Sequence, residues 1–192
     1  MMELQGDVPK FHTPPPRVDG YLFTSSSEQL IAQARLDGFT LSRLKPYHTG
    51  DMFIEEARDL WRRYVQVARP SKVTRLAVRN VNRIEMEAGS PLERYVLTVP
   101  EIARSLPQIL EGFFLRLLLP DASGAHAIVT ETFGETRPET QVIPLILDVD
   151  AFREVDLGPD DADVWQVVSD LRAFKNRIFF NSLTAQCLEA YR

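Results

Sequence analysis

The sequence predicts an α+β fold built on a mostly antiparallel sheet, with two main helices at about residues 53–68 and 161–190 packed on one face of that sheet. Strand-like segments follow one another in runs, two long segments have helical periodicity, and strand–helix–strand alternation is scarce, a combination typical of this class. We expect residues 1–19, which contain a proline cluster, to form a partly disordered lead-in, and residues 20–192 to form a single domain.

Composition limits the classes of function. The chain of 192 residues is 44% hydrophobic and 26% charged, as in an ordinary globular protein. Its formal net charge of −5 gives no general attraction to nucleic acid or to an anionic membrane. Cys187 is the single cysteine, which excludes a disulfide scaffold and a cysteine-rich zinc site. No apolar run approaches the roughly 18–20 residues of a membrane span, so we expect a cytoplasmic protein without a membrane partner.

Short strands are predicted in the N-terminal part of the chain. Ordered structure should begin at Gly20, residues 21–25 and 39–44 have strand composition, and Gly38 marks a turn before the second segment. Residues 30–36 fit either another strand or a short helix. Two or three antiparallel strands joined by tight turns account for this part most simply.

A strong amphipathic helix is predicted at residues 53–68. Its apolar side chains, among them Leu60 and Tyr64, recur at three- and four-residue intervals, while charged residues cover the remaining surface. Acidic residues come early and basic residues late, which suits the helix dipole. Pro70 ends the helix.

The segment 73–85 is the most strand-like in the chain, and its two sides are unusual. Side chains alternate between the faces of a strand, so a half-buried strand should be apolar on one side and polar on the other. Here one side repeats arginine, and the other contains two amides among aliphatic residues. The arginines are Arg75, Arg79 and Arg83, and the amides are Asn80 and Asn82.

The rest of the chain completes the predicted sheet. A capping box at residues 98–101 predicts a short helix over residues 99–106. Three further strands are predicted, at residues 112–119, 126–133 and 141–152. The C-terminal helix begins near residue 161, and it either crosses the whole sheet or breaks near Asn181 and Ser182, which are good capping residues.

Two explanations fit the arginine row. Arginines on one strand face at spacings of roughly 13 Å could follow a phosphate backbone or an acidic segment. Alternatively, each arginine pairs with a carboxylate in a cross-strand ladder, for which Asp148 and Asp150 are suited because they share one strand face. The sequence favours the ladder.

The amide pair is the least ordinary feature of the sequence. An inward-pointing amide without a hydrogen-bond partner costs about 1–3 kcal/mol in desolvation. Asn80 and Asn82 are therefore either satisfied by the backbone or line a polar pocket. The candidate binding residues are Arg79, Asn80, Asn82, Arg83, Asp148 and Asp150.

The sequence contains no complete catalytic set. Asp148, Asp150 and Glu131 could supply oxygen ligands to a divalent ion in a metal-assisted hydrolase or phosphodiesterase. The Asp-x-Asp pattern is common, however, and pairing with arginine accounts for it more simply. The histidines have no metal-like spacing, and no glycine-rich phosphate loop is present. We expect no metal, no cofactor and no catalysis.

Four segments carry a resemblance to a known family. They are residues 20–25, 75–84, 147–152 and 174–184, and together they extend over nearly all of the chain after the lead-in. On these segments the chain resembles a family of sporadically distributed, uncharacterised bacterial proteins. Its members usually carry a further N-terminal strand and helix, and an aromatic residue where this chain has Asn80. The family's patchy distribution suggests mobile defence or toxin–antitoxin modules.

The expected function is binding. The preferred hypothesis is a non-enzymatic interaction protein that uses an uncovered sheet face and a pocket at the two asparagines. The alternatives are the metal-assisted hydrolase and a nucleic-acid binder that uses Arg75, Arg79 and Arg83. The partner, a protein or a small ligand, is not identified by the sequence, and exposure of Phe180 on the last helix would fit a homo-oligomer.

Overall fold

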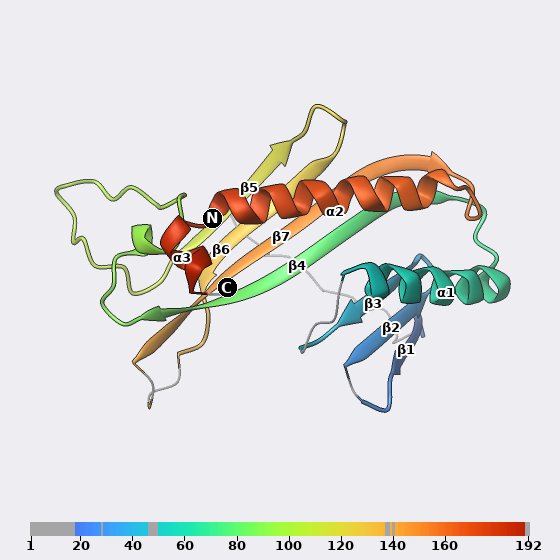
Figure 1. Ribbon diagram of the computed structural model, residues 1–192, viewed down its shortest axis with the longest axis horizontal. Helices are drawn as coiled ribbons and strands as arrows, with labels where there is room; N and C mark the ends of the chain where they lie inside the picture. The colour runs from blue at the N-terminus through green and yellow to red at the C-terminus, as the bar shows by residue number, and fades with distance from the viewer. Residues whose placement is uncertain (1–17, 28, 46–49, 137–138, 140, 191–192) are drawn as a thin grey trace, which may run out of the picture. The chain divides into compact units, whose positions relative to one another are not determined.

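The computed structural model in Figure 1 describes residues 18–27, 29–45, 50–136, 139 and 141–190. The chain divides into two compact units, Met1–Pro70 and Ser71–Arg192, in place of the single domain that we expected for residues 20–192. Both units combine helices with an antiparallel sheet, so the predicted α+β class is confirmed. Most of the predicted lead-in, residues 1–19, lies outside the described residues.

The N-terminal unit is a three-stranded antiparallel sheet in the order β1-β2-β3, followed by one helix. Its elements are β1 (Gly20–Thr24), β2 (Leu30–Arg35), β3 (Gly38–Arg43) and α1 (Gly50–Ala68). The segment that fitted either a strand or a helix is therefore the strand β2. α1 packs on β3, where the Phe39 ring centroid lies 6.1 Å from that of Trp61 and 5.5 Å from that of Tyr64. The Tyr64 hydroxyl donates to the Arg35 carbonyl at 2.9 Å.

The C-terminal unit is a four-stranded antiparallel sheet in the order β4-β7-β6-β5. Its strands are β4 (Val73–Glu87), β5 (Phe114–Pro120), β6 (His126–Phe133) and β7 (Val142–Leu157). Its helices are the 3-10 turn η1 (Leu92–Arg94), α2 (Asp163–Ser182) and α3 (Ala185–Glu189). Figure 1 shows α2 lying along the sheet over the long strands β4 and β7.

The core of this unit lies between the sheet and α2. β7 is an inner strand, and its side chains Leu145, Leu147 and Val149 on the helix side have no exposed surface. From α2, Leu171 and Phe174 pack on the same side. Burial of this face follows from the alternation of strand side chains, which places every second residue of β7 toward the helix.

The C-terminal helix breaks, as one of the two sequence alternatives predicted. α2 ends at Ser182, Leu183 is extended, and it forms an isolated bridge with Val96. The Thr184 hydroxyl then caps α3 by accepting a hydrogen bond from the Cys187 backbone N–H at 3.1 Å. The break turns the chain back onto the end of the sheet, where Leu183 and Cys187 are buried in the core.

Two details of the predicted architecture are wrong. The main helices do not share one face of one sheet, because α1 packs in the N-terminal unit and α2 in the C-terminal unit. Nor do residues 99–106 form a helix. Leu106 and Ile109 in this region are exposed, so a short helix here would gain little burial, and tertiary packing supplies most helical stability in proteins.

Among the helices in the described part of the chain, none is both long and apolar enough to cross a membrane.

Candidate functional site on the open face of the sheet

The four-stranded sheet has one face covered by α2 and one face that no described element of its own unit covers. We call the second face the open face. On β4 it carries Arg75, Arg79, Val81 and Arg83, and on β7 it carries Ile146, Asp148, Asp150 and Phe152. Asn80 and Asn82 point to the opposite, helix-covered side, because they alternate with these residues along β4.

The structure therefore divides the predicted binding residues between the two faces. Four of them share the open face, namely Arg79, Arg83, Asp148 and Asp150, and the two asparagines do not. Because the sheet backbone separates the two sets, they cannot contact one ligand together. A site made from all six predicted residues is not formed.

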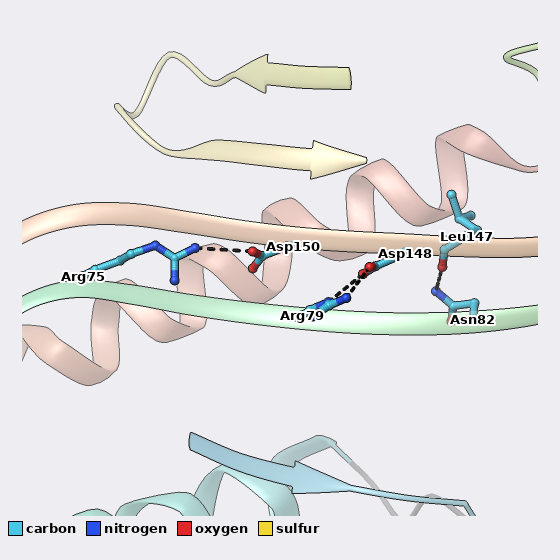
Figure 2. Close-up of polar contacts among 6 residues, drawn as sticks. All are labelled: Arg75, Arg79, Asn82, Leu147, Asp148 and Asp150. Atoms are coloured by element: carbon cyan, nitrogen blue, oxygen red, sulfur yellow. Dashed lines mark hydrogen bonds and ion pairs between the residues drawn. The ribbon is translucent and has the colours of Figure 1, made fainter. Parts of the chain in front are cut away.

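The arginine row is largely a ladder of ion pairs, as Figure 2 shows. Arg79 donates from Nε and Nη2 to the two carboxylate oxygens of Asp148, at 2.9 and 2.6 Å. Arg75 Nη2 donates to Asp150 Oδ2 at 3.3 Å. The Arg79 contact is diagonal, since the residue directly opposite Arg79 is Asp150. Arg75 lies opposite Glu154 and reaches farther along β7, past Phe152, to Asp150. Diagonal neighbours lie within the reach of long side chains.

An aromatic stack completes one end of the open face. The Arg75 guanidinium lies over the Phe152 ring, with its central carbon 4.6 Å from the ring centroid. Phe152 in turn stacks on His126, with centroids 5.6 Å apart. Arg75 thus crosses the Phe152 ring to reach Asp150 and is held by both contacts.

Arg83 and Arg79 have different electrostatic surroundings. The hydrogen bond to Asp148 is the main cause that raises the pKa of Arg79 above its ordinary value. The Arg83 side chain has no ion pair or hydrogen bond to another residue that the structure describes, and Ile146 lies opposite it on β7. Arg83 is therefore the arginine of the row that is available to a partner.

The two asparagines are joined to each other and to the backbone. Asn82 Nδ2 donates to the Leu147 carbonyl at 3.0 Å, and Asn80 Nδ2 donates to Asn82 Oδ1 at 3.2 Å. Of the two alternatives left open by the sequence, a hydrogen bond to the backbone is therefore the one that applies to Asn82. A hollow of about 270 Å³ lies nearby in the same unit, and neither asparagine is among its lining residues. These are Ile84, Glu85, Glu87, Arg94, Tyr95, Gln186, Cys187 and Ala190.

Glu131 lies in the core, away from the two aspartates. It is opposite Leu147 on β7, so it points to the helix-covered side, and only 1% of its surface is exposed. Burial raises the pKa of its carboxyl from 4.5 to about 7, and its Oε2 has no hydrogen-bond partner among the residues that the structure describes. Glu131, Asp148 and Asp150 cannot bind one ion, because they lie on opposite faces of the sheet. Among the described residues no group of three His, Cys, Asp or Glu side chains is placed to hold a metal.

The open face also carries apolar residues that sequence reasoning missed. Phe114 and Leu118 on β5 are 70% and 61% exposed, and Val81 on β4 is 52% exposed. The register places all three on the open face, since Leu118 is opposite Ile128 and Phe114 is opposite Thr132. The run at residues 113–119 is apolar except for one arginine, so its alternation could not be read from the sequence.

Comparison with protein-family models, with curated proteins and with solved structures found no match to this chain. The resemblance noted from the sequence therefore stays a prediction, and the open face has to be interpreted from its own chemistry.

A double-mutant cycle tests the ion-pair ladder. Replacing Arg79 and Asp148 with alanine, singly and together, should give a coupling energy of about 0.2–1 kcal/mol, because the pair is partly exposed to solvent. The coupling should shrink at high salt. The measurement is urea unfolding, with Arg79 and Asp156 as the control pair, because Asp156 pairs with Lys72 instead. Equal coupling in both cycles would contradict the ladder.

Proposed function

We propose that this chain is a non-enzymatic binding protein, and that the open face of the four-stranded sheet docks a protein partner. The observation that supports this most directly is the exposure of Phe114 and Leu118 on a face that also carries the half-exposed Val81. Exposed apolar surface rimmed by polar residues is typical of protein interaction sites. Phe114 and Leu118 share one face of β5 with Arg116 between them, and Val81 lies on β4 at the other edge of the sheet. Aromatic and arginine side chains, both present on this face, are enriched in such interfaces.

The shape of the site favours a macromolecular partner over a small ligand. Small-molecule sites are concave and enclose most of the ligand surface. Phe114, Leu118 and Val81 instead stand on one face of a sheet, and none of them lines the hollow in this unit. A protein surface can cover such a face with side chains from several of its own elements.

The charge balance of the open face argues against nucleic acid. Arg75 and Arg79 are neutralised by their ion pairs with Asp150 and Asp148. A nucleic-acid track needs an excess of positive charge along the phosphate backbone. Arg83 and Arg116, at different strands of the sheet, do not form such a track.

The metal-assisted hydrolase has no support from the geometry, because its three carboxylates lie on two faces. The proposed partner is therefore a protein, and the setting that we propose is the bacterial cytoplasm. The family resemblance favours a partner encoded beside this chain in a mobile defence or toxin–antitoxin module. The proposed interface would pair the apolar residues of β5 with apolar side chains of that partner, while Arg83 meets a carboxylate.

Capture experiments with matched variants test this function. We expect Leu118→Asp to reduce partner capture from a native lysate by about 30-fold or more, as loss of an interface hot spot does. The control is Ile109→Asp, because Ile109 is also strongly exposed in this unit but lies outside the sheet. It should capture the same partner as the wild-type chain does. Circular dichroism checks that both variants fold.

Two outcomes would overturn the proposal. The first is a discrete partner that both variants capture equally well, which would place the contact elsewhere on the chain. The second is a partner lost equally in both variants, which would mean that added charge disturbs binding wherever it is placed.

A further inference from the structure

Among the strands that the structure describes, β4 forms a long free edge of the four-stranded sheet. It is hydrogen-bonded to β7 on one side and is the first strand in the sheet order. It has 15 residues, whereas β5 at the other edge has 7 and ends at Pro120. An edge strand presents a row of backbone donors and acceptors, which proteins shorten, shield or pair.

The usual protection of a free edge is weak on β4. From Arg75 to Glu87 its register with β7 runs without a bulge, and the strand contains no proline. Charged side chains can also shield an edge. Arg75 and Arg79, however, are directed toward β7 by their ion pairs with Asp150 and Asp148 (Figure 2). These two arginines therefore leave the outer edge of β4 accessible.

The helix-covered side of β4 is incompletely buried. Leu76 and Val78 pack against the core cluster that α2 contributes to, but both stay half-buried, as do Asn80 and Asn82. Farther along the strand, Ile84 reaches full burial. An element added beside β4 would complete the burial of this side, and it would have to accept two amides in the middle of an apolar row.

We propose that β4 pairs antiparallel with β4 of a second copy of this chain, about a twofold axis at Asn80, so that two four-stranded sheets join into one of eight strands. Asn80 is the midpoint of Val73–Glu87, so this register pairs the strand along its whole length. Residues that are equally distant from Asn80 then face one another. Leu76 meets Ile84 of the second copy, and Asn80 meets its own counterpart.

The charges of β4 select this register. Pairing about Asn80 places Arg75 opposite Glu85 of the second copy, and no like charges face one another. A twofold axis at Arg79 or at Val81 would place arginines opposite arginines. An axis at Val78 or at Asn82 avoids that clash but pairs only part of the strand, so charge and paired length together favour Asn80. A twofold axis that passes between two residues would place the helix-covered side of one copy and the open face of the other on the same side of the joined sheet.

A second copy explains the amide pair better than an unrelated strand does. At the axis, the amide of Asn80 meets an identical amide, and two amides can donate to and accept from each other. A single polar residue in an apolar row is a known means of fixing the register between identical helices, and we extend this role to identical strands. This accounts for Asn80 on the side of β4 that should be apolar, while Asn82, which faces Val78 of the second copy, donates to the Leu147 carbonyl of its own chain.

Disulfide trapping tests the axis directly. Opposed Cα atoms in an antiparallel pair lie about 4.5–5.5 Å apart, within the range that a disulfide spans. Asn80→Cys should therefore form a cross-linked dimer under mild oxidation, seen on a non-reducing gel. Asn82→Cys is the matched control, because its two copies would be offset along the strand by about 13 Å. The native Cys187 is buried, so the wild-type chain should not cross-link.

A charge swap at exposed positions tests the same pairing without touching the core. Glu85→Arg should weaken self-association by about tenfold, because it puts arginine opposite Arg75 of the second copy. Adding Arg75→Glu to that variant should restore association. Residues 75 and 85 lie about 33 Å apart in one strand, so this rescue can only arise between two copies. Sedimentation velocity across the micromolar range is the measurement.

A wild-type chain that stays monomeric throughout this range would overturn the pairing, and cross-linking of Asn82→Cys in preference to Asn80→Cys would overturn the register. These outcomes are separate from partner binding by the open face, because Leu118, whose substitution tests that binding, lies on β5 at the other edge of the sheet.

Discussion

Replacing Glu131 with glutamine is expected to remove a pH dependence of about 3 kcal/mol from the stability of the C-terminal unit. The carboxyl is buried in the core, its pKa is raised to about 7 by burial, and no described residue forms a hydrogen bond with its Oε2. The folded unit therefore favours the neutral form of Glu131, whereas the unfolded chain ionises it near pH 4.5.

The sign of this effect follows from proton binding. Between about pH 4.5 and pH 7 the unfolded state holds fewer protons at this position than the folded state. The free energy of unfolding therefore falls as pH rises through this interval, and the loss is complete above it. Below pH 4.5 both states are protonated, so Glu131 causes no further change. Glutamine carries no charge at any pH and lacks this dependence.

The difference in the free energy of unfolding between Glu131→Gln and the wild-type chain isolates the contribution of Glu131 from that of other titrating groups. The free energy of unfolding of Glu131→Gln minus that of the wild-type chain should rise by about 3 kcal/mol from pH 4.5 to pH 8. Urea unfolding is followed by fluorescence of Trp165 in the C-terminal unit, with Trp61 replaced by phenylalanine in both proteins. A difference that stays constant with pH would show that the Glu131 carboxyl is solvated or paired.

Replacing Leu147 with alanine is expected to destabilise the same unit by about 2–5 kcal/mol. Leu147 has no exposed surface and lies at the centre of β7, and its carbonyl accepts the hydrogen bond from Asn82. The shortened side chain would leave a cavity beneath α2. Leu118→Ala makes the same chemical change on the open face, and it should cost less than about 1 kcal/mol.

Urea unfolding of both leucine variants by Trp165 fluorescence compares the two faces of one sheet. Similar losses at Leu147 and Leu118 would mean that the open face is buried in the free chain, and the proposed docking surface would then not be available. A small loss at Leu147 would contradict the position of the core between β7 and α2.

Much of the fold could be predicted from local patterns. The alternation at residues 73–85 identified β4, and the three- and four-residue spacing of apolar side chains identified α1 and α2. Their division into two units could not be predicted, because strand composition does not say which strands pair. The absence of a helix at residues 99–106 could not be predicted either, because a capping box indicates a local preference for helix and gives no information on tertiary packing.

The candidate site could be predicted only in part, because the sequence does not show which strands pair. Opposite charges on β4 and β7 indicated the ladder, and Arg79 and Asp148 form it. The asparagines were correctly assigned to the apolar side of β4, but their hydrogen bond to Leu147 depends on the pairing of two distant strands. Phe114 and Leu118 were missed because a continuous apolar run does not show which of its residues remain exposed.

Hydroxyl-radical footprinting is the most direct test of the open face as the interaction surface, because it reports the solvent exposure of single side chains. In the free chain, Phe114 and Leu118 should be oxidised as readily as the exposed Ile109. In the complex with the captured partner, Phe114 and Leu118 should become protected while Ile109 stays reactive. Protection of Ile109 with unchanged oxidation of Phe114 and Leu118 would contradict the proposed function.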